Sequence, residues 1–321
     1  MKQFFYDHFL KTIEMHYPRK SDLANALIEI LPLEKESVYR RLRKDVYFSA
    51  EEVMQIAQVL GISLDNIICS NPTKTRPFHF SMVEYVQPQE ADYQILEDYN
   101  RDLEVIGQDP NGRMVEVINT LPRSLYSRSE LLTRFFTMKW LYKYALSQEV
   151  KPLGSIRIPE RMRSLDLEYV RLVHNVSEVH SIHDSRFVER TVDDIAYFRS
   201  VGMVTEDEAA LLRDELLTLI DYMADVANIG YFRHTGNKLF FYLSHTWLDS
   251  EYLLFESNLL TLSSVRILER NSIASTDKKV FDKFMNMVQA IKCSSVLMSG
   301  SNTLQQVEFF SRQRTMVEGI R

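Results

Sequence analysis

Apolar residues in the first part of the chain recur every three or four positions, which is the spacing of one face of an α-helix. A first helix is predicted to end before Pro18. A second is predicted to start with Ser21 as its N-cap and to stop at Pro32. The positions that the spacing places in the core of these two helices are Phe5, Phe9, Ile13, Leu23, Leu27 and Leu31.

A third and a fourth helix follow, and the start of the fourth is the most clearly marked point of the chain. The third is predicted over about 34–44, with Val38 and Leu42 as its buried pair. Ser49-Ala50-Glu51-Glu52 has the pattern of a capping box, in which the serine hydroxyl and the second glutamate cap each other's backbone amides. Gly61 is predicted to end the fourth helix, and a short fifth helix follows.

The pattern changes after these five helices. Residues 1–69 are predicted to form a first domain, 70–77 a linker in which Pro and Asn replace the periodic apolar residues, and 78–321 a second domain. The second domain is predicted to open with a strand over 78–86. The segments of the second domain predicted to be helical lie at about 93–106, 113–120, 128–147, 160–178, 186–200, 205–227, 277–292 and 303–318. The β-branched and aromatic runs predicted to pair as three antiparallel strands lie at 238–247, 251–257 and 259–268.

The expected fold class is therefore mainly α: a small five-helix domain followed by a larger, helix-rich α+β domain with a small antiparallel sheet near 238–268. A hydrophobic fraction of 45% with 11% aromatics suffices for real cores and excludes a mainly disordered chain. The helix around 135–144 is apolar on almost every face, which predicts core packing, with a ligand pocket or a dimer face as the alternatives.

Charge is distributed unevenly, although the net charge of −6 excludes a wholly basic nucleic-acid binder. Residues 1–47 hold nine basic and seven acidic side chains, a balance of +2, which leaves −8 for the rest of the chain. Residues 34–44 alone hold five basic and two acidic residues. The third helix is thus the part of the chain best suited to meet a phosphate backbone.

Several classes of chemistry lack support in the sequence. GxGxxG, GxxxxGK[ST], HExxH and GxSxG are all absent, so neither an enzyme nor a cofactor is expected. His174, His180 and His183, followed by Asp184, match no zinc signature, and we interpret them as ordinary surface or hydrogen-bonded histidines with no metal site. Two cysteines, no signal peptide and no long apolar stretch predict a cytoplasmic protein without a membrane partner.

The five-helix string resembles the Cro/lambda-repressor-type (XRE) helix-turn-helix domain. The resemblance lies in Asp22-Leu23-Ala24, in Glu36 to Leu42 and, most specifically, in Leu60-Gly61-Ile62-Ser63-Leu64-Asp65. It covers about a fifth of the chain and implies a DNA-binding fold for residues 1–69 only. One departure is the separation of 14 residues between Ala24 and Val38, which predicts a longer or differently bent junction between the second and third helices.

The third helix then offers a recognition face. With Val38 and Leu42 inward, a rotation of about 100° per residue turns the opposite side of the helix toward DNA. The residues predicted to contact DNA are Lys35, Glu36, Ser37, Tyr39, Arg40, Arg43 and Lys44. An exposed arginine suits guanine, and Lys35 and Lys44 suit phosphates.

The function expected from these observations is a DNA-binding transcriptional regulator with a C-terminal regulatory domain. A homodimer is expected because one small recognition helix buries too little surface for tight specific binding. The exposed edges of a three-stranded sheet and the apolar helix around 135–144 add to that expectation and place the dimer contacts in residues 78–321. A small-molecule or protein effector is the further partner considered. The alternative is a protein-interaction scaffold that uses the helical N-terminal module for protein contacts rather than for DNA.

Overall fold

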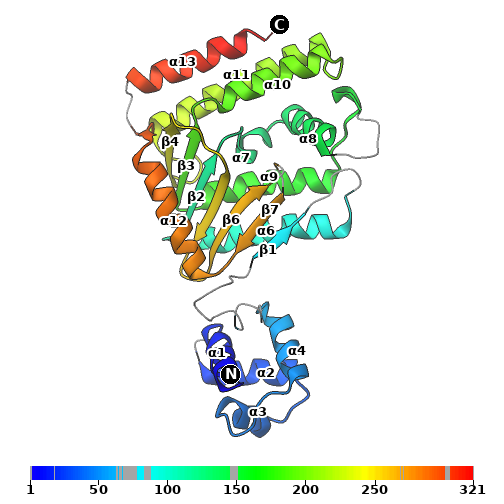
Figure 1. Ribbon diagram of the computed structural model, residues 1–321, viewed down its shortest axis with the longest axis vertical. Helices are drawn as coiled ribbons and strands as arrows, with labels where there is room; N and C mark the ends of the chain where they lie inside the picture. The colour runs from blue at the N-terminus through cyan, green and yellow to red at the C-terminus, as the bar shows by residue number, and fades with distance from the viewer. Residues whose placement is uncertain are drawn as a thin grey trace. The chain divides into compact units, whose positions relative to one another are not determined.

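The computed structural model describes residues 2–17, 19–62, 64, 67, 78–82, 88–144, 151–267, 269, 271–300 and 304–320. The chain divides into two compact units, Met1–Pro77 and Phe78–Arg321 (Figure 1). The predicted linker at 70–77 lies outside the described residues, as do most of the predicted fifth helix and residues 83–87 of the predicted first strand.

The first unit packs short helices around one apolar core. Its helices are α1 (Lys2–Met15), α2 (Lys20–Ile30), α3 (Lys35–Leu42) and α4 (Ala50–Leu60). The side chains that the core encloses almost completely include Phe9, Ile13, Leu23, Leu27, Leu31, Val38 and Ile56. The inward face predicted for these helices is confirmed, except that Phe5 and Leu42 are half-buried.

The ends of α4 follow the sequence signals, whereas the start of α2 does not. The Ser49 hydroxyl accepts from the Glu52 amide at 3.1 Å, and the Glu52 carboxylate accepts from the Ser49 amide at 2.8 Å. Gly61 closes α4 with φ of +65°, a conformation that costs glycine little. The prediction of Ser21 as the N-cap of α2 is wrong, because the carbonyl of Arg19 already accepts the first helical amides and α2 begins at Lys20.

The second unit contains a mixed sheet of eight strands. The strands are β1 (His79–Ser81), β2 (Arg113–Ile118), β3 (Glu178–Asp184), β4 (Lys238–Ser244), β5 (Glu251–Glu256), β6 (Thr261–Ile267), β7 (Asn271–Ser275) and β8 (Val296–Leu297). Their order across the sheet is β1-β7-β6-β5-β2-β3-β4-β8. β2, β3 and β4 run parallel to one another, and every other neighbouring pair is antiparallel.

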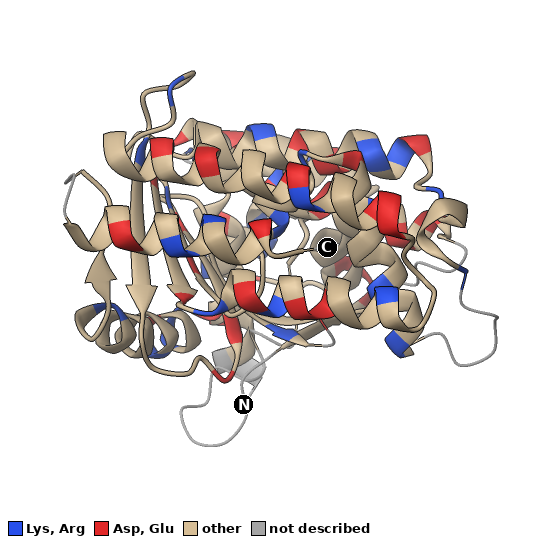
Figure 2. Ribbon diagram, turned by 90° about the horizontal axis from the view of Figure 1, so that it is seen from above, with Lys and Arg blue, Asp and Glu red and all other residues tan. Residues whose placement is uncertain are grey.

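Helices cover both faces of this sheet (Figure 1). They are α6 (Glu90–Gln108), α7 (Arg123–Tyr126), α8 (Glu130–Tyr144), α9 (Glu160–Asn175), α10 (Phe187–Ser200), α11 (Glu206–Ile229), α12 (Lys278–Cys293) and α13 (Leu304–Glu318). Met114 of β2 packs with the core of α6 and α9, whereas its neighbours Val115 and Val117 pack with the core of α12. Acidic and basic residues are interspersed along the outer helices, as Figure 2 shows.

The expected fold class is wrong: the second unit is α/β, with a large mixed sheet in place of a small antiparallel one. The predicted helix at 113–120 is strand β2, and β3 follows the predicted helix at 160–178, which ends at Asn175. The runs at 238–247, 251–257 and 259–268 are strands, but only the last two pair with each other. The first of them, β4, pairs in parallel with β3.

The sequence pattern does not identify β2 and β3 as strands because both faces of the sheet are buried at these strands. A strand of a parallel sheet covered by helices on both sides has no polar face, so it lacks the alternation that identifies a half-buried strand. All residues of β2 after Arg113 are buried, and its six residues could equally be a turn and a half of buried helix. In β3, the polar side chains of His180, Ser181 and His183 are buried as well, which hides the strand further.

The apolar helix around 135–144 has the core role that the sequence favoured. The central residues of α8, from Leu132 to Trp140, are buried apart from half-buried Arg134. Leu132, Phe135, Phe136 and Met138 belong to the largest apolar cluster of the unit. The exposed edges of a three-stranded sheet no longer argue for a dimer, since the sheet has eight strands. The argument from two DNA half-sites does not depend on the sheet.

Candidate nucleic-acid interface and a polar pocket

The connection between α2 and α3 is short despite the extra residues in this region. Those residues extend α2 as far as Ile30, and the connection itself runs from Leu31 to Glu34. Buried Leu31 and half-buried Leu33 anchor this connection to the core. Four connecting residues are within the range typical of a helix-turn-helix.

The structure places the predicted DNA-contacting residues together on α3 and just beyond its end. The exposed members of the set are Lys35, Glu36, Arg40, Arg43 and Lys44. Ser37 and Tyr39 are half-buried, and Tyr39 packs partly against the core. The exposed members therefore form a continuous polar surface that we call the α3 face.

Two cations of the α3 face are engaged in ion pairs within the unit. Arg43 contacts Glu36 at 2.8 Å and Asp45 at 3.2 Å, and Lys44 contacts Asp7. These side chains are between 42% and 73% exposed, so solvent and salt screen the charges. Each pair therefore contributes little to the stability of the unit. A phosphate could displace the carboxylates at small cost.

Arg40 and Lys35 differ from Arg43 and Lys44. Neither side chain has an ion pair or hydrogen bond with any described residue, and both are exposed. Their donors face water rather than protein. Arg40 is therefore the side chain of the α3 face best placed to contact a base edge without first breaking another interaction.

Arg41 is a neighbour of the α3 face that the sequence analysis did not single out, and its side chain points inward. Its guanidinium donates to both carboxylate oxygens of Glu52, at 3.0 and 2.8 Å, and to the Ser37 carbonyl at 3.2 Å. Glu52 is also the capping-box residue of α4. This bidentate pair therefore fixes α3 to α4. The feature of the sequence that could have predicted this inward orientation is the position of Arg41 next to the apolar positions Val38 and Leu42.

We expect Arg41→Ala to lower the free energy of unfolding of the first unit by about 1–3 kcal/mol, because Glu52 would lose its charged partner in a mostly buried position. Urea unfolding followed by far-UV circular dichroism measures this change. Both tryptophans, Trp140 and Trp247, lie in the second unit, so their fluorescence reports that unit separately. Lys35→Ala is the matched control and should change the unfolding free energy little; an equal loss in both variants would contradict the role assigned to Arg41.

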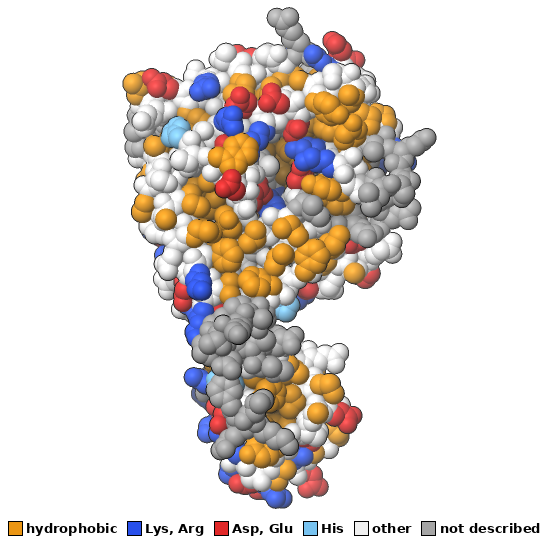
Figure 3. Space-filling view, viewed as in Figure 1, with side chains coloured by type: hydrophobic (Ala, Val, Ile, Leu, Met, Phe, Trp, Pro, Cys, Tyr) orange, Lys and Arg blue, Asp and Glu red, His pale blue; other side chains and the backbone are white. Residues whose placement is uncertain are grey.

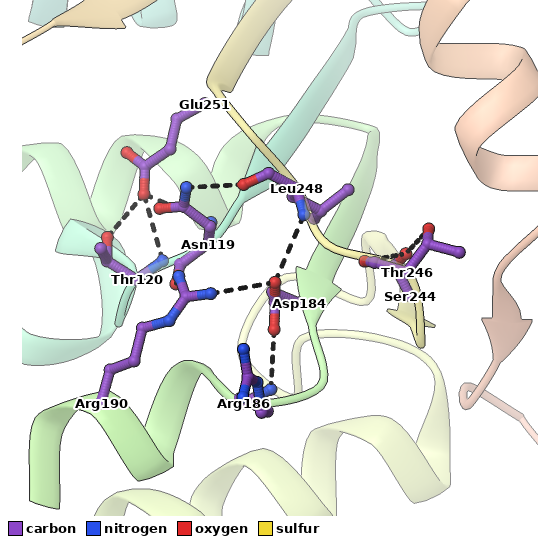
Figure 4. A network of polar contacts seen from close by, with 9 residues as sticks. All are labelled: Asn119, Thr120, Asp184, Arg186, Arg190, Ser244, Thr246, Leu248 and Glu251. Carbon is purple, nitrogen blue, oxygen red and sulfur yellow. Dashed lines mark hydrogen bonds and ion pairs between the residues drawn. The ribbon is translucent and has the colours of Figure 1, made fainter. Parts of the chain in front are cut away.

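In the second unit, a polar network joins the carboxyl ends of the three parallel strands (Figure 4). Asp184, the last residue of β3, accepts from the Arg186 amide at 2.9 Å and from the Leu248 amide at 3.3 Å, and it pairs with Arg190 at 3.2 Å. Arg190 also donates to the carbonyl of Asn119, which follows β2, at 2.6 Å. This edge of an α/β sheet is where ligands usually bind.

Glu251 at the start of β5 extends the network. One of its carboxylate oxygens accepts from the amides of Asn119 and Thr120 and, at 2.6 Å, from the Thr120 hydroxyl. Its other oxygen accepts from the guanidinium of Arg266 at 2.9 Å. The network therefore holds Glu251 and Arg266 in fixed positions beside a pocket.

This pocket lies between α6, α7, α9 and the sheet, and encloses a cavity of about 90 Å³. The ionisable residues and tyrosines that line it include Glu116, Arg123, Asp166, Glu251, Arg266, Tyr99, Tyr126 and Tyr169. Figure 3 shows acidic and basic side chains around a hollow on this face of the second unit. We call it the Glu116 pocket. Its size suits a small molecule rather than a drug-sized one.

Glu116 belongs to a buried chain of three polar side chains on neighbouring strands. The Ser181 hydroxyl donates to Glu116, and the same hydroxyl lies 2.6 Å from Nε2 of His183. A neutral His183 that donates from Nε2 to Ser181 satisfies both contacts. Burial raises the pKa of Glu116 to about 7, and burial lowers the pKa of His183 to about 3.

We expect the neutral His183 to make the second unit less stable as the pH falls. Because the folded-state pKa of about 3 lies below the unfolded value of 6.5, only the unfolded chain takes up a proton on this ring between these pH values. Replacing the ring by His183→Gln removes that dependence. The difference in unfolding free energy between wild type and variant should therefore narrow by about 2 kcal/mol from about pH 7.5 to about pH 5.

Tryptophan fluorescence in urea at the two pH values measures this difference. His234→Gln, at an exposed histidine of the same unit, is the control. The difference in unfolding free energy between wild type and this variant should be the same at both pH values. A difference for His183→Gln that stays constant with pH would show that the ring takes up its proton as readily in the folded state as in the unfolded chain.

His174 and His180, the other histidines considered from the sequence, do not belong to the chain of Glu116, Ser181 and His183. His174 stacks on Phe232 with ring centroids 4.3 Å apart, and His180 stacks on Phe240 at 4.6 Å. Burial lowers the pKa of each to about 4. Among the described residues, no group of three or more His, Cys, Asp or Glu is placed to hold a metal ion.

Comparisons with protein-family models, with curated proteins and with solved structures found no match to this chain. None of the helices in the described part of the chain has the length and hydropathy that crossing a membrane requires.

Proposed function

We propose that the protein is a DNA-binding transcriptional regulator that reads the major groove with α3. The observation that carries this proposal is the α3 face, where Arg40 and Lys35 are exposed without any partner among the described residues. The four-residue connection after α2 supports it, since such a connection is typical of a helix-turn-helix.

In this proposal Lys35, Glu36, Ser37, Arg40 and Lys44 each have a defined role. The first turn of a recognition helix contacts base edges, which assigns Glu36 and Ser37 to the groove. Arg40 lies one turn further along and reads a guanine through its two parallel N–H donors. Lys35 and Lys44 contact phosphates, which position the helix without specifying sequence.

The protein acts as a dimer, with the second unit as its regulatory part. A single α3 contacts too few bases for nanomolar specific binding, so two half-sites are read by a two-fold dimer. The half-sites are then separated by one helical turn of DNA, about 34–36 Å, or by a multiple of it.

Selection of bound duplexes from a random DNA pool tests the proposal with the full chain. We expect enrichment of a palindromic motif whose half-sites have this spacing, and binding that weakens steeply with salt. Failure to enrich any motif, with no DNA binding even at low salt, would favour the alternative of a protein-interaction scaffold.

A further inference from the structure

The Glu116 pocket contains hydrogen-bonding capacity that the described residues do not use. Glu116 is 95% buried, yet its only hydrogen bond to a described residue is the one that Ser181 donates to Oε1. Arg266, which lines the same pocket, donates from Nη1 to Glu251, and its Nε and Nη2 have no partner among the described residues. The Glu116 carboxylate and the Arg266 guanidinium therefore line the same cavity, and each can form further hydrogen bonds with a ligand.

The charges around the cavity leave Glu116 without a counterion. Arg123 pairs with Asp166 at 2.6 Å and Arg266 pairs with Glu251 at 2.9 Å, so each of these two pairs is neutral. Glu269, which also lines the cavity, is neutralised by Lys143 at 2.5 Å. His183, the nearest titratable group on β3, stays neutral because burial lowers its pKa to about 3. An ionised Glu116 thus gives the pocket a net charge of −1, which favours a ligand with one positive group.

The walls add a preference for a compact organic cation. Tyr99 and Tyr169 line the cavity with ring centroids 5.7 Å apart. The Arg123 guanidinium already lies over the ring of Tyr169, 4.6 Å from its centroid, so this wall accommodates a cation beside a tyrosine ring. A cavity of about 90 Å³ has room for a molecule of only a few heavy atoms. The spare donors of Arg266 require an oxygen acceptor on the same molecule.

We propose that the Glu116 pocket binds a small primary amine that also carries an oxygen acceptor, with its ammonium group on Glu116 and its oxygen on Arg266. α-Amino acids and amino alcohols both have this chemistry. The ligand site goes beyond DNA binding and is detected without DNA, so the two proposals fail independently.

Isothermal titration calorimetry with the full chain tests the site. The probes are the small standard L-α-amino acids and a second set of amino alcohols that includes ethanolamine and serinol. We expect saturable binding of at least one probe, and the set to which it belongs identifies the source of the amine. The N-acetyl derivative of that probe, which lacks the ammonium charge, should bind at least tenfold more weakly.

Glu116→Gln supplies the second test, because the amide oxygen can still accept from Ser181 while the charge is lost. We expect this variant to bind the probe at least tenfold more weakly, whereas Glu215→Gln, at an exposed glutamate of α11, should bind it as wild type does. Wild-type affinity should rise about tenfold from about pH 6 to about pH 8, because the raised pKa of Glu116, about 7, makes its ionisation limit binding. The variant should lack that rise.

Three results would overturn the proposal: no probe binds at millimolar concentration, the N-acetyl derivative binds as well as the amine, or a folded Glu116→Gln retains wild-type affinity. Far-UV circular dichroism shows whether the variant is folded. If it is not, the comparison of amine with N-acetyl derivative and the pH profile of the wild type decide the question without it.

Discussion

Arg40→Ala should lose between about fivefold and about 150-fold in affinity for the selected DNA site, corresponding to about 1–3 kcal/mol, while its affinity for random DNA changes much less. The physical reason is the position of this side chain. Arg40 is exposed on α3 and has no partner among the described residues, so its guanidinium meets a base edge without first leaving a carboxylate. Fluorescence anisotropy with both DNAs at a fixed salt concentration measures the two affinities.

Two neighbouring substitutions serve as controls for Arg40. Lys35→Ala, which removes a proposed phosphate contact, should weaken binding to specific and random DNA alike and reduce the salt slope by about one. Arg43→Ala should have a smaller effect than Arg40→Ala, because Arg43 is shared between Glu36 and Asp45. An equal loss on both DNAs for Arg40→Ala would assign that residue to the phosphate backbone instead of a base.

Gly112→Ala should destabilise the second unit by about 3 kcal/mol. Gly112 lies in the tight turn between α6 and β2, where its amide donates to the Asp109 carbonyl at 2.8 Å. A β-carbon at this position would lie 2.0 Å from the carbonyl oxygen of Ile106 and 2.9 Å from that of Asp109. Both are backbone atoms, so the turn itself must open and displace the start of β2 in the middle of the sheet.

Urea unfolding followed by tryptophan fluorescence measures this loss, because both tryptophans report the second unit. Gly236→Ala is the matched control: Gly236 has φ of +74° and nothing within 4 Å of the added carbon. We expect it to cost only about 1–2 kcal/mol of backbone strain. A loss for Gly112→Ala no larger than for Gly236→Ala would show that the turn relaxes freely.

The helices could largely be predicted because their signals are local. The capping box at Ser49 marks a helix start that the structure confirms, since a cap depends only on residues within one turn, and α11 starts with the same arrangement at Thr205. Gly61 and Gly230 close α4 and α11 in the left-handed conformation for the same reason. The apolar spacing also identified the core of the first unit, including Val38 on α3, except that Phe5 and Leu42 are half-buried.

The Glu116 pocket could not be predicted from sequence. Its chemical groups come from α6, β2, α7, α9, β5 and β6, and Glu116 and Arg266 are 150 residues apart. Neither residue belongs to a motif, and Glu116 lies in the strand that the pattern predicted as a helix. The balance of charges depends on which pairs meet in space, and sequence distance carries no information about that.

The sequence by itself determined where most helices of this protein begin and end, which residues of the first unit are buried, and that the third helix carries a cluster of basic residues. These properties follow from interactions within a few residues of each other or from one helical period. The tertiary structure decided the rest: that β2, β3 and β4 join a mixed α/β sheet, that Arg41 turns inward to Glu52 while Arg40 faces solvent, and that Glu116 is buried beside Arg266. Strand pairing and charge compensation are contacts between distant segments, so their energies are fixed only when the chain is folded.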